Sequence, residues 1–199
     1  MKSNSDSKVH TVCVYCGASP NVADKYKDIA LRTGQTIADN GLDLVYGGGR
    51  SGLMGIVADT ALKAGSKVTG IIPGHIDQRE IRHEELTELH VVDSMHERKA
   101  MMAELTDAFI VLPGGCGTMD EFFEILTWRQ LGLHDKPILV LNEEGYWSPL
   151  VNLLEHIKSN EFMKEEDYNL VNVFTNLQDM MGYIKNVHVN KRQVMQEYI

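Results

Sequence analysis

Short apolar runs alternate with longer helical patterns along most of this 199-residue chain. Strands that alternate with helices are joined by crossover connections, which produce a parallel sheet with helices packed on both of its faces. We therefore predict a single α/β domain with about seven strands. The expected strands cover residues 11–15, 42–46, 67–72, 88–92, 109–112, 138–141 and 170–174.

Two end segments fall outside this alternation. Residues 1–10 lack the apolar core of a signal peptide and are predicted to be a short disordered leader. Residues 186–199 form a C-terminal tail that either docks as a helix or frays. The domain itself is then expected to occupy residues 11–185.

The composition excludes several classes of partner. A net charge of −9 argues against broad nucleic-acid binding, which requires basic surfaces that displace counterions. The chain has no apolar run near the ~20 residues of a membrane span. Its three cysteines imply no disulfide framework, which suits a reducing cytosol. We therefore expect a cytoplasmic protein without nucleic-acid or membrane partners.

The segment 108–124 carries the strongest functional signal. An apolar run ends at Pro113, which has no N–H to donate to a sheet, and three glycines follow before a helical pattern begins at Thr118. A strand, a glycine turn and a helix start direct unpaired backbone N–H groups and the positive end of the helix dipole at one point, where an anion binds well. Glu121 adds a carboxylate beside that point, which suggests chemistry on a phosphorylated molecule.

A second glycine-rich turn, residues 47–55, also opens a helix. The loops at the carboxyl ends of parallel strands meet in one crevice, so segments 17–19, 47–52, 93–99 and 113–121 are expected to share a site. Two such turns favour a nucleotide or a sugar phosphate as ligand. Neither turn has the Walker sequence, and no dinucleotide fingerprint follows the first strand.

Each charged candidate also has a purely structural interpretation. Thr118 and Glu121 have capping-box spacing, so Glu121 could serve only to reach back to the helix start. Arg98 and Lys99, which follow a second capping-box pattern at Ser94, could form an ordinary solvated face. Cations near a helix start oppose its dipole at a cost of ~0.3–1 kcal/mol each, which favours an anionic partner for them.

Redox and metal chemistry have little support in the sequence. Cys13 and Cys16 would lie on opposite faces of a strand, whereas a redox pair belongs at a helix start. The eight histidines form no H-E-x-x-H or similar pair, so no metal site is expected.

Five sequence segments resemble the Lonely Guy (LOG) family of cytokinin-activating phosphoribohydrolases, which are often mislabelled as lysine decarboxylases. They are CGAS at 16–19, GGGRSGLMG at 47–55, SMHERK at 94–99, PGGCGTMDE at 113–121 and TWRQLGLHDKP at 127–137. The likeness spans about residues 11–174, and Cys116 occupies the variable position of the glycine turn. The decarboxylase label lacks physical support, because no lysine has the setting of a pyridoxal Schiff base.

This resemblance implies a Rossmann-like domain that cleaves the N-glycosidic bond of a purine nucleoside 5′-monophosphate, with either an N6-modified adenine or plain AMP as substrate. The expected products are the free base and ribose 5-phosphate, with no cofactor and no metal, from a homodimer or a larger homo-oligomer. Arg98 and Glu121 match the catalytic pair of the family. Substrate and phosphate contacts are expected at Gly17, Ser19, Gly48, Gly49, Glu80, Met95, Lys99, Gly114, Gly115, Cys116, Gly117, Thr118 and Thr127.

Two other functions remain open from the sequence. A carrier of a nucleotide or phosphorylated cofactor would use the same anion site without turnover. A role with single-stranded DNA is a weaker alternative, because the chain is acidic and lacks a basic strip with interleaved aromatics. Trp128 and Leu131 are candidates for an apolar base slot or a dimer face, with ordinary helix packing as the alternative.

Overall fold

A seven-stranded parallel sheet forms the centre of the computed structural model, which describes residues 6–74 and 82–190. The strand order is β5-β4-β3-β2-β6-β7-β8, and every neighbouring pair is parallel. This confirms the predicted single α/β domain. The strands are β2 (Thr11–Tyr15), β3 (Asp43–Tyr46), β4 (Val68–Pro73), β5 (Glu88–Val92), β6 (Ala108–Val111), β7 (Ile138–Leu141) and β8 (Val171–Phe174).

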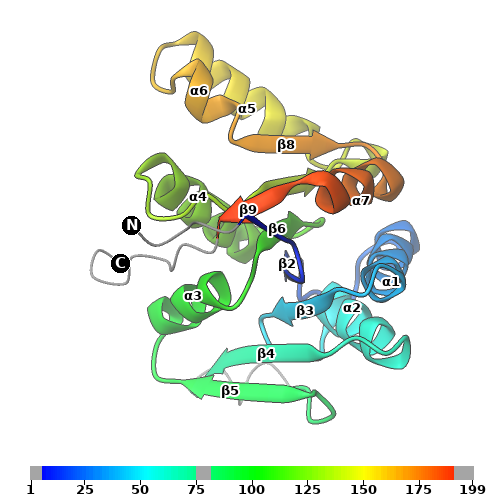
Figure 1. The fold of residues 1–199 in the computed structure, drawn as a ribbon. Helices are drawn as coiled ribbons and strands as arrows, with labels where there is room; N and C mark the ends of the chain where they lie inside the picture. Colours follow the sequence, from blue (N-terminus) through cyan, green and yellow to red (C-terminus); the bar gives the residue numbers. More distant parts are fainter. Residues whose placement is uncertain (1–5, 75–81, 191–199) are drawn as a thin grey trace, which may run out of the picture.

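Helices cover both faces of the sheet (Figure 1). One face packs against α1 (Asp24–Asp39), α2 (Gly52–Lys63) and α7 (Leu177–Asn186). The other packs against α3 (Met95–Glu104), α4 (Cys116–Gln130) and α5 (Ser148–Ser159). The short helices η1 (Glu143–Gly145) and α6 (Glu165–Tyr168) lie in connections.

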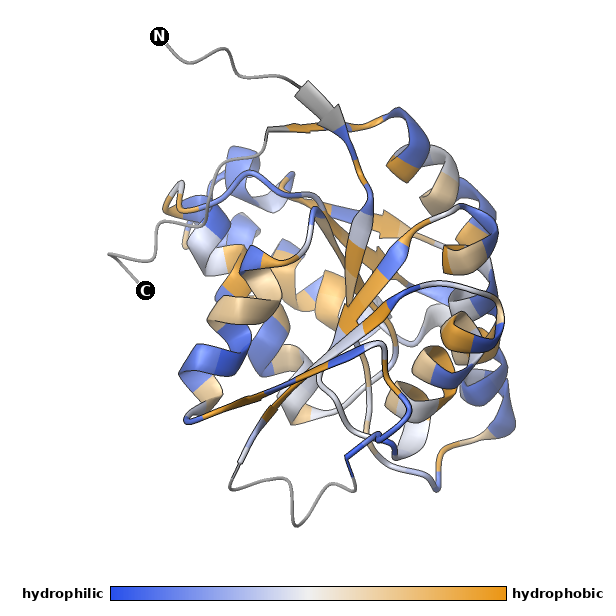
Figure 2. Ribbon diagram, turned by 60° about the horizontal axis from the view of Figure 1, so that its bottom comes forward, coloured by the Kyte–Doolittle hydropathy of each residue, from blue (hydrophilic) through white to orange (hydrophobic). Residues whose placement is uncertain are grey.

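The central strands are apolar on both faces because both faces are covered. In β2, Val12 and Val14 belong to one core cluster, whereas Cys13 and Tyr15 belong to the other. The sequences of such strands are continuous hydrophobic runs rather than an alternation of hydrophobic and polar residues. Figure 2 shows this concentration of hydrophobic residues in the strands, with hydrophilic residues on the outer surfaces of the helices.

The order of the strands creates a crevice between β2 and β6. From β2 the chain proceeds through β3, β4 and β5 on one side, and then returns to place β6 on the other side. The loops that leave the carboxyl ends of β2 and β6 therefore diverge, and such a switch point is where ligands bind in open α/β sheets.

A two-stranded antiparallel sheet lies outside the main one. It pairs β1 (Asp6–Lys8) with β9 (His188–Asn190). The first of these strands lies in the segment 1–10 that the sequence predicted to be disordered, and the second lies in the tail predicted to be a helix or frayed. Three-residue strands are too short to give a sequence signal, and each obtains its partner only because the two ends of the domain meet.

The helix starts agree with the sequence to within two residues. Ser94 caps α3 as predicted, since its Oγ accepts a hydrogen bond from the Glu97 N–H at 3.1 Å. α4 begins at Cys116 rather than at Thr118, with Gly115 as its N-cap. α5 begins at Ser148, with Pro149 in its first turn, where proline is tolerated because its missing N–H would have no partner in the helix.

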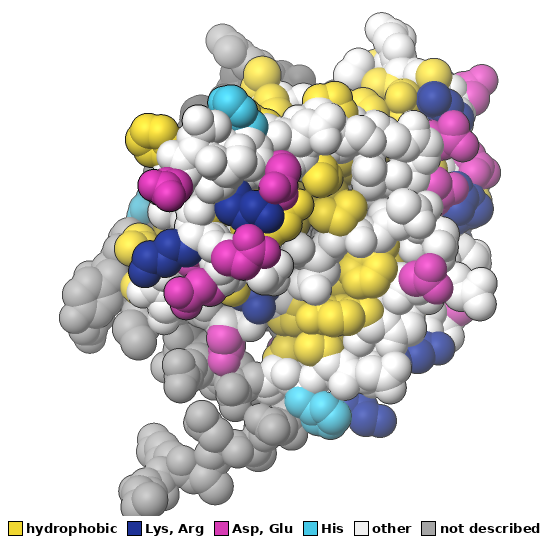
Figure 3. All heavy atoms as spheres, turned by 90° about the horizontal axis from the view of Figure 1, so that it is seen from above, with side chains coloured by type: hydrophobic (Ala, Val, Ile, Leu, Met, Phe, Trp, Pro, Cys, Tyr) yellow, Lys and Arg dark blue, Asp and Glu magenta, His cyan; other side chains and the backbone are white. Residues whose placement is uncertain are grey.

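The β8 edge of the sheet is partly open. Val173 in this strand is 41% exposed. Figure 3 views the molecule from the side of α5, α6 and β8 and shows hydrophobic side chains across the middle of this face, with charged side chains mostly beside them. Within the described ranges, every helix is too short or too polar to reach across a lipid bilayer.

Candidate active site

A cleft of about 480 Å³ opens at the switch point between β2 and β6. Its floor and one wall come from segments 16–19 and 113–118, which follow these two strands. Side chains from α1, α2, α3 and α4 complete it, together with Tyr146 from the connection after β7.

The start of α4 presents backbone N–H groups that are suited to hold an anion. Its first intrahelical hydrogen bond runs from the Met119 N–H to the Gly115 carbonyl at 3.1 Å. The N–H groups of the preceding residues, Cys116, Gly117 and Thr118, therefore have no partner inside the helix. They combine with the positive end of the helix dipole, which is the arrangement that binds phosphate at helix starts.

The glycines of this turn have different roles. A Cβ on Gly114 would lie 2.0 Å from Thr118 Oγ1, so the fold itself requires glycine there. A Cβ on Gly115 or Gly117 would meet no described atom within 4 Å. These two glycines line the cleft, and they leave open the space that a ligand would occupy.

Arg98 and Glu121 form an ion pair at the base of the cleft, with 3.2 Å between Arg98 Nη1 and Glu121 Oε1. Each residue is only 8% exposed. Arg98 Nε also donates to the Ile71 carbonyl at 3.1 Å, and its Nη2 donates to the Gly47 carbonyl at 3.4 Å. The guanidinium is thus fixed by the ends of β4 and β3, and it orients the carboxylate.

This geometry removes one alternative that the sequence left open. The capping-box interpretation of Glu121 is wrong, because Gly115, not Thr118, is the N-cap of α4. Glu121 lies about one and a half turns further along the helix and faces Arg98. Arg98 is likewise no part of a solvated face, since it is buried.

Lys99, the neighbour of Arg98, has a different environment. Its Nζ lies 3.0 Å from both Asp120 Oδ2 and Glu124 Oε2. Burial lowers the pKa of Lys99, but the hydrogen bonds to Glu124 and Asp120 outweigh this effect, so the pKa is raised overall. The Arg98–Glu121 ion pair and the cluster of Lys99 with Asp120 and Glu124 therefore both join α3 to α4.

The two buried thiols, Cys13 and Cys16, are poor nucleophiles. Burial raises the pKa of the Cys16 thiol, and the charge of Glu121 raises it further. The same two causes raise the pKa of Cys13. The two cysteines lie in different core clusters on opposite faces of the sheet, as predicted, and each is a free thiol.

The structure brings many, though not all, of the expected site residues to the cleft. Those that line it are Gly17, Ser19, Arg98, Gly114, Gly115, Gly117, Thr118 and Glu121. Gly48, Gly49, Met95, Lys99, Cys116 and Thr127 are not among the lining residues. Glu80 lies outside the described residues.

Sequence reasoning missed the apolar wall of the cleft, which consists of Val22, Tyr26, Leu53, Met54 and Tyr146. Tyr26 lies in the first turn of α1, whereas Val22 precedes that helix. Tyr146 follows the carboxyl end of β7, so the rule that such loops share one edge could have found it. Trp128 packs in the core instead of a base slot, and Leu131 is 69% exposed.

The described residues offer neither a metal cluster nor a Schiff-base lysine at the cleft. In the ranges 6–74 and 82–190, no three His, Cys, Asp or Glu side chains gather to hold a metal ion. No lysine occurs among the described residues that line the cleft. The buried Lys136 donates from Nζ to the carbonyls of Ala103 and Glu104, at the end of α3.

Comparisons with known proteins identify the relatives of this chain. A family model described as possible lysine decarboxylase matches residues 54–184. A cytokinin riboside 5′-monophosphate phosphoribohydrolase of Rhodococcoides fascians is 47% identical over 177 residues, which are 88% of this chain and 89% of that protein. The phosphoribohydrolase LOG1 of Arabidopsis thaliana is 44% identical over 158 residues, covering 79% of this chain and 74% of that protein.

Solved structures share the fold at lower identity. The molybdenum cofactor carrier protein of Chlamydomonas reinhardtii has a TM-score of 0.68 and 21% identity, covering 90% of this chain and 97% of that one. DNA processing protein A of Helicobacter pylori has a TM-score of 0.58 and 16% identity, covering 88% of this chain and 80% of that one. On the sequence matches, the chain belongs to the Lonely Guy family of cytokinin riboside 5′-monophosphate phosphoribohydrolases.

Proposed function

We propose that this protein hydrolyses the N-glycosidic bond of a purine nucleoside 5′-monophosphate and releases the free base and ribose 5-phosphate. The substrate carries an N6-modified adenine, as the names of its relatives indicate for them, or is AMP itself. The observation that carries the proposal is a buried carboxylate, Glu121, which an arginine holds about one and a half helical turns from an open helix start.

In this proposal the start of α4 binds the 5′-phosphate. The N–H groups of residues 115–118 hold the phosphate oxygens, and this anchors the ribose over Glu121. A cleft of about 480 Å³ lies within the usual volume range for sites that bind small ligands. The apolar wall that includes Leu53 and Met54 provides surface for the purine.

Positive charge develops on the ribose as the bond between C1′ and N9 breaks, as it does in glycoside hydrolysis generally. Glu121 stabilises this charge and orients the attacking water, whose oxygen forms the new bond to C1′. The electron pair of the broken bond leaves with the base, which takes up a proton. Arg98 positions Glu121 throughout.

The direct test is to incubate the protein with AMP, with N6-isopentenyladenosine 5′-monophosphate and with adenosine, and to measure the free base by chromatography. We expect base release from at least one monophosphate, with ribose 5-phosphate in equal amount, and much slower release from adenosine, which lacks the anchoring phosphate. Binding of AMP without base release would instead identify a nucleotide carrier. A protein that neither binds nor cleaves any of the three would contradict the proposal.

The assembly expected from the family, a homodimer or larger homo-oligomer, stays part of this proposal. Size-exclusion chromatography with light scattering measures it directly, and a monomer at assay concentrations would contradict it.

A further inference from the structure

Tyr146 makes a polar contact with the glycine turn that no sequence motif indicates. Its hydroxyl donates a hydrogen bond to the Gly114 carbonyl at 2.7 Å. The two residues are 32 positions apart and follow different strands, β6 and β7. Both also line the cleft.

The position of this carbonyl matters because a peptide unit is planar and trans. When the Gly114 carbonyl points towards Tyr146, the N–H of Gly115 in the same peptide unit points the opposite way. Gly115 is the N-cap of α4, so this N–H is the first donor of the proposed phosphate site. The peptide unit is flanked by two glycines, which restrict its rotation less than any other residues would. A hydrogen bond to its carbonyl therefore selects one orientation of this donor.

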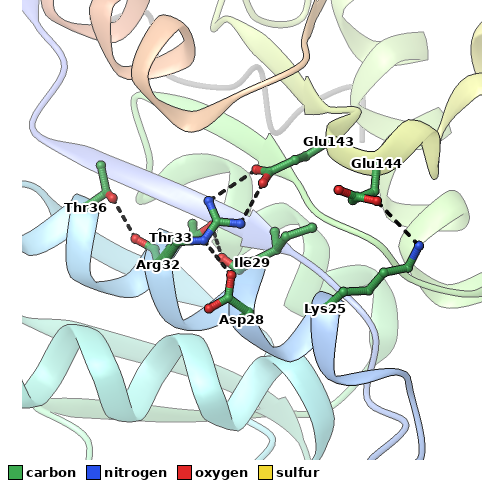
Figure 4. Close-up of polar contacts among 8 residues, drawn as sticks. All are labelled: Lys25, Asp28, Ile29, Arg32, Thr33, Thr36, Glu143 and Glu144. Atoms are coloured by element: carbon green, nitrogen blue, oxygen red, sulfur yellow. Dashed lines mark hydrogen bonds and ion pairs between the residues drawn. The ribbon is translucent and has the colours of Figure 1, made fainter.

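The connection that carries Tyr146 is itself fixed to α1 (Figure 4). Arg32 contacts both oxygens of Glu143, at 2.6 Å from Nη2 and 3.3 Å from Nη1. Lys25 Nζ lies 3.8 Å from Glu144 Oε2. These contacts attach η1, the helix immediately before Tyr146, to a helix that also lines the cleft.

Two aromatic rings pack against the ring of Tyr146. The Tyr26 ring from α1 meets it edge-on, with 5.1 Å between centroids and 75° between planes. The Trp147 ring meets it at 4.9 Å and 88°, and Trp147 is only 4% exposed. The hydroxyl is therefore presented to Gly114 by a rigid support.

We propose that Tyr146 is a positioning residue for phosphate recognition, which orients the Gly114–Gly115 peptide so that its N–H completes the anion site. This inference rests on the proposed function of the cleft. It assigns to the connection after β7 a role in binding the phosphate, although that connection does not contact the phosphate itself.

The variant Tyr146→Phe tests this role because it keeps the ring and removes only the hydroxyl. A net hydrogen bond corresponds to about a threefold to tenfold change in an equilibrium constant. We expect the Kd for ribose 5-phosphate and the KM for AMP to rise by about that factor, with kcat changed less than KM. Binding of adenosine should stay within about twofold of the wild type, because adenosine does not use the anion site.

The matched control is Tyr183→Phe. Tyr183 packs against Phe174 and is not among the residues that line the cleft, so the loss of its hydroxyl should leave all three constants unchanged. A second variant, Glu143→Gln, weakens the attachment of η1 without touching the cleft. Glu143→Gln should also raise the Kd for ribose 5-phosphate, by a smaller factor than Tyr146→Phe does.

The outcomes separate this inference from the proposed function. Wild-type protein that binds ribose 5-phosphate but releases no base would overturn the hydrolase proposal, and the binding comparison would still test Tyr146. Equal loss of affinity for adenosine and ribose 5-phosphate in Tyr146→Phe would show general loosening of the cleft and overturn the positioning role. An unchanged Kd for ribose 5-phosphate in that variant would overturn it as well.

Discussion

Arg98 and Glu121 face each other across the junction of α3 and α4, with 3.2 Å between Nη1 and Oε1 and with both residues buried. An ion pair that is largely removed from water is costly to form, and removing one partner leaves an uncompensated charge. The additional hydrogen bonds from Arg98 to the carbonyls of Ile71 and Gly47 offset part of that cost. The first predictions concern this pair.

Glu121→Gln should abolish most of the activity while it preserves the fold. The amide keeps the shape of the side chain but loses the negative charge that stabilises the developing cation. We expect the rate of adenine release from AMP to fall more than about tenfold, which corresponds to ~1.4 kcal/mol of transition-state stabilisation. The matched control is Asp120→Asn, the same chemical change at the adjacent position, where the carboxylate pairs with Lys99 outside the cleft. Similar rates for the two variants would refute a catalytic role for Glu121.

Gly47→Ala should disable the site through Arg98. The added Cβ would lie 1.9 Å from Arg98 Nη2, so the guanidinium would have to leave its place between Gly47 and Glu121. We expect base release to fall at least about tenfold. Gly182→Ala in α7 is the control, because a Cβ there meets no described atom within 4 Å. Full activity in the Gly47 variant would show that the observed position of Arg98 is not needed for the reaction.

The two glycines Gly114 and Gly117 should respond in opposite ways to alanine. Gly114→Ala forces a methyl group against Thr118, and overpacking of this kind costs about 1–3 kcal/mol of stability. Gly117→Ala has room within the protein and adds a better helix former, so stability should hold or rise by up to ~1 kcal/mol. Its methyl group would instead occupy ligand space and raise the KM for AMP. Denaturant unfolding measures the stability of both variants, and steady-state kinetics measure their KM for AMP. An unchanged KM in Gly117→Ala would contradict the prediction.

His134 should make stability depend on pH. Burial lowers the pKa of His134 to about 4, and its Nε2 contacts the Ile125 carbonyl at 2.8 Å. The unfolded chain takes up this proton near pH 6.5, whereas the folded chain resists it down to about 4. The contribution of neutral His134 to the free energy of unfolding is therefore complete above pH 6.5. It is lost as pH falls towards 4, and the loss amounts to up to about 3 kcal/mol.

The measurement is the free energy of unfolding in urea at pH 7 and at pH 4.5, compared between the wild type and His134→Asn. Other groups titrate in this interval too, so the difference between the two proteins is the relevant quantity. His96→Asn, at an exposed position on α3, serves as the control. An equal loss of stability on acidification in all three proteins would contradict the assignment to His134.

The sequence was sufficient to predict the sheet because the alternation of strand and helix patterns is long and regular. Three predicted strands, 11–15, 88–92 and 138–141, coincide with β2, β5 and β7. The glycine turn could also be predicted, because Pro113 and three glycines between a strand and a helix leave few other conformations. The antiparallel pair of β1 and β9 could not be predicted, since a strand of three residues carries no periodic signal.

The environments of individual side chains were harder to predict. Arg98 and Lys99 are consecutive on a helix, and a rotation of about 100° between neighbours sends one into the cleft and the other to Asp120 and Glu124. The spacing of the residues does not mark which of the two cations faces inwards, and only the family resemblance singled out Arg98. Tyr146 is a single aromatic residue after a strand, so its contact with Gly114 depends on tertiary structure alone.

The proposed anion site at the start of α4 consists of main-chain groups, so among side-chain replacements only a proline, which lacks the N–H, can delete one of its donors. Cys116 contributes an N–H to this site, yet its side chain is exposed and is not among the lining residues. Position 116 is therefore a suitable attachment point for a thiol-reactive fluorophore. Such a label would report substrate arrival from a few ångströms away while the donors that bind the phosphate stay intact.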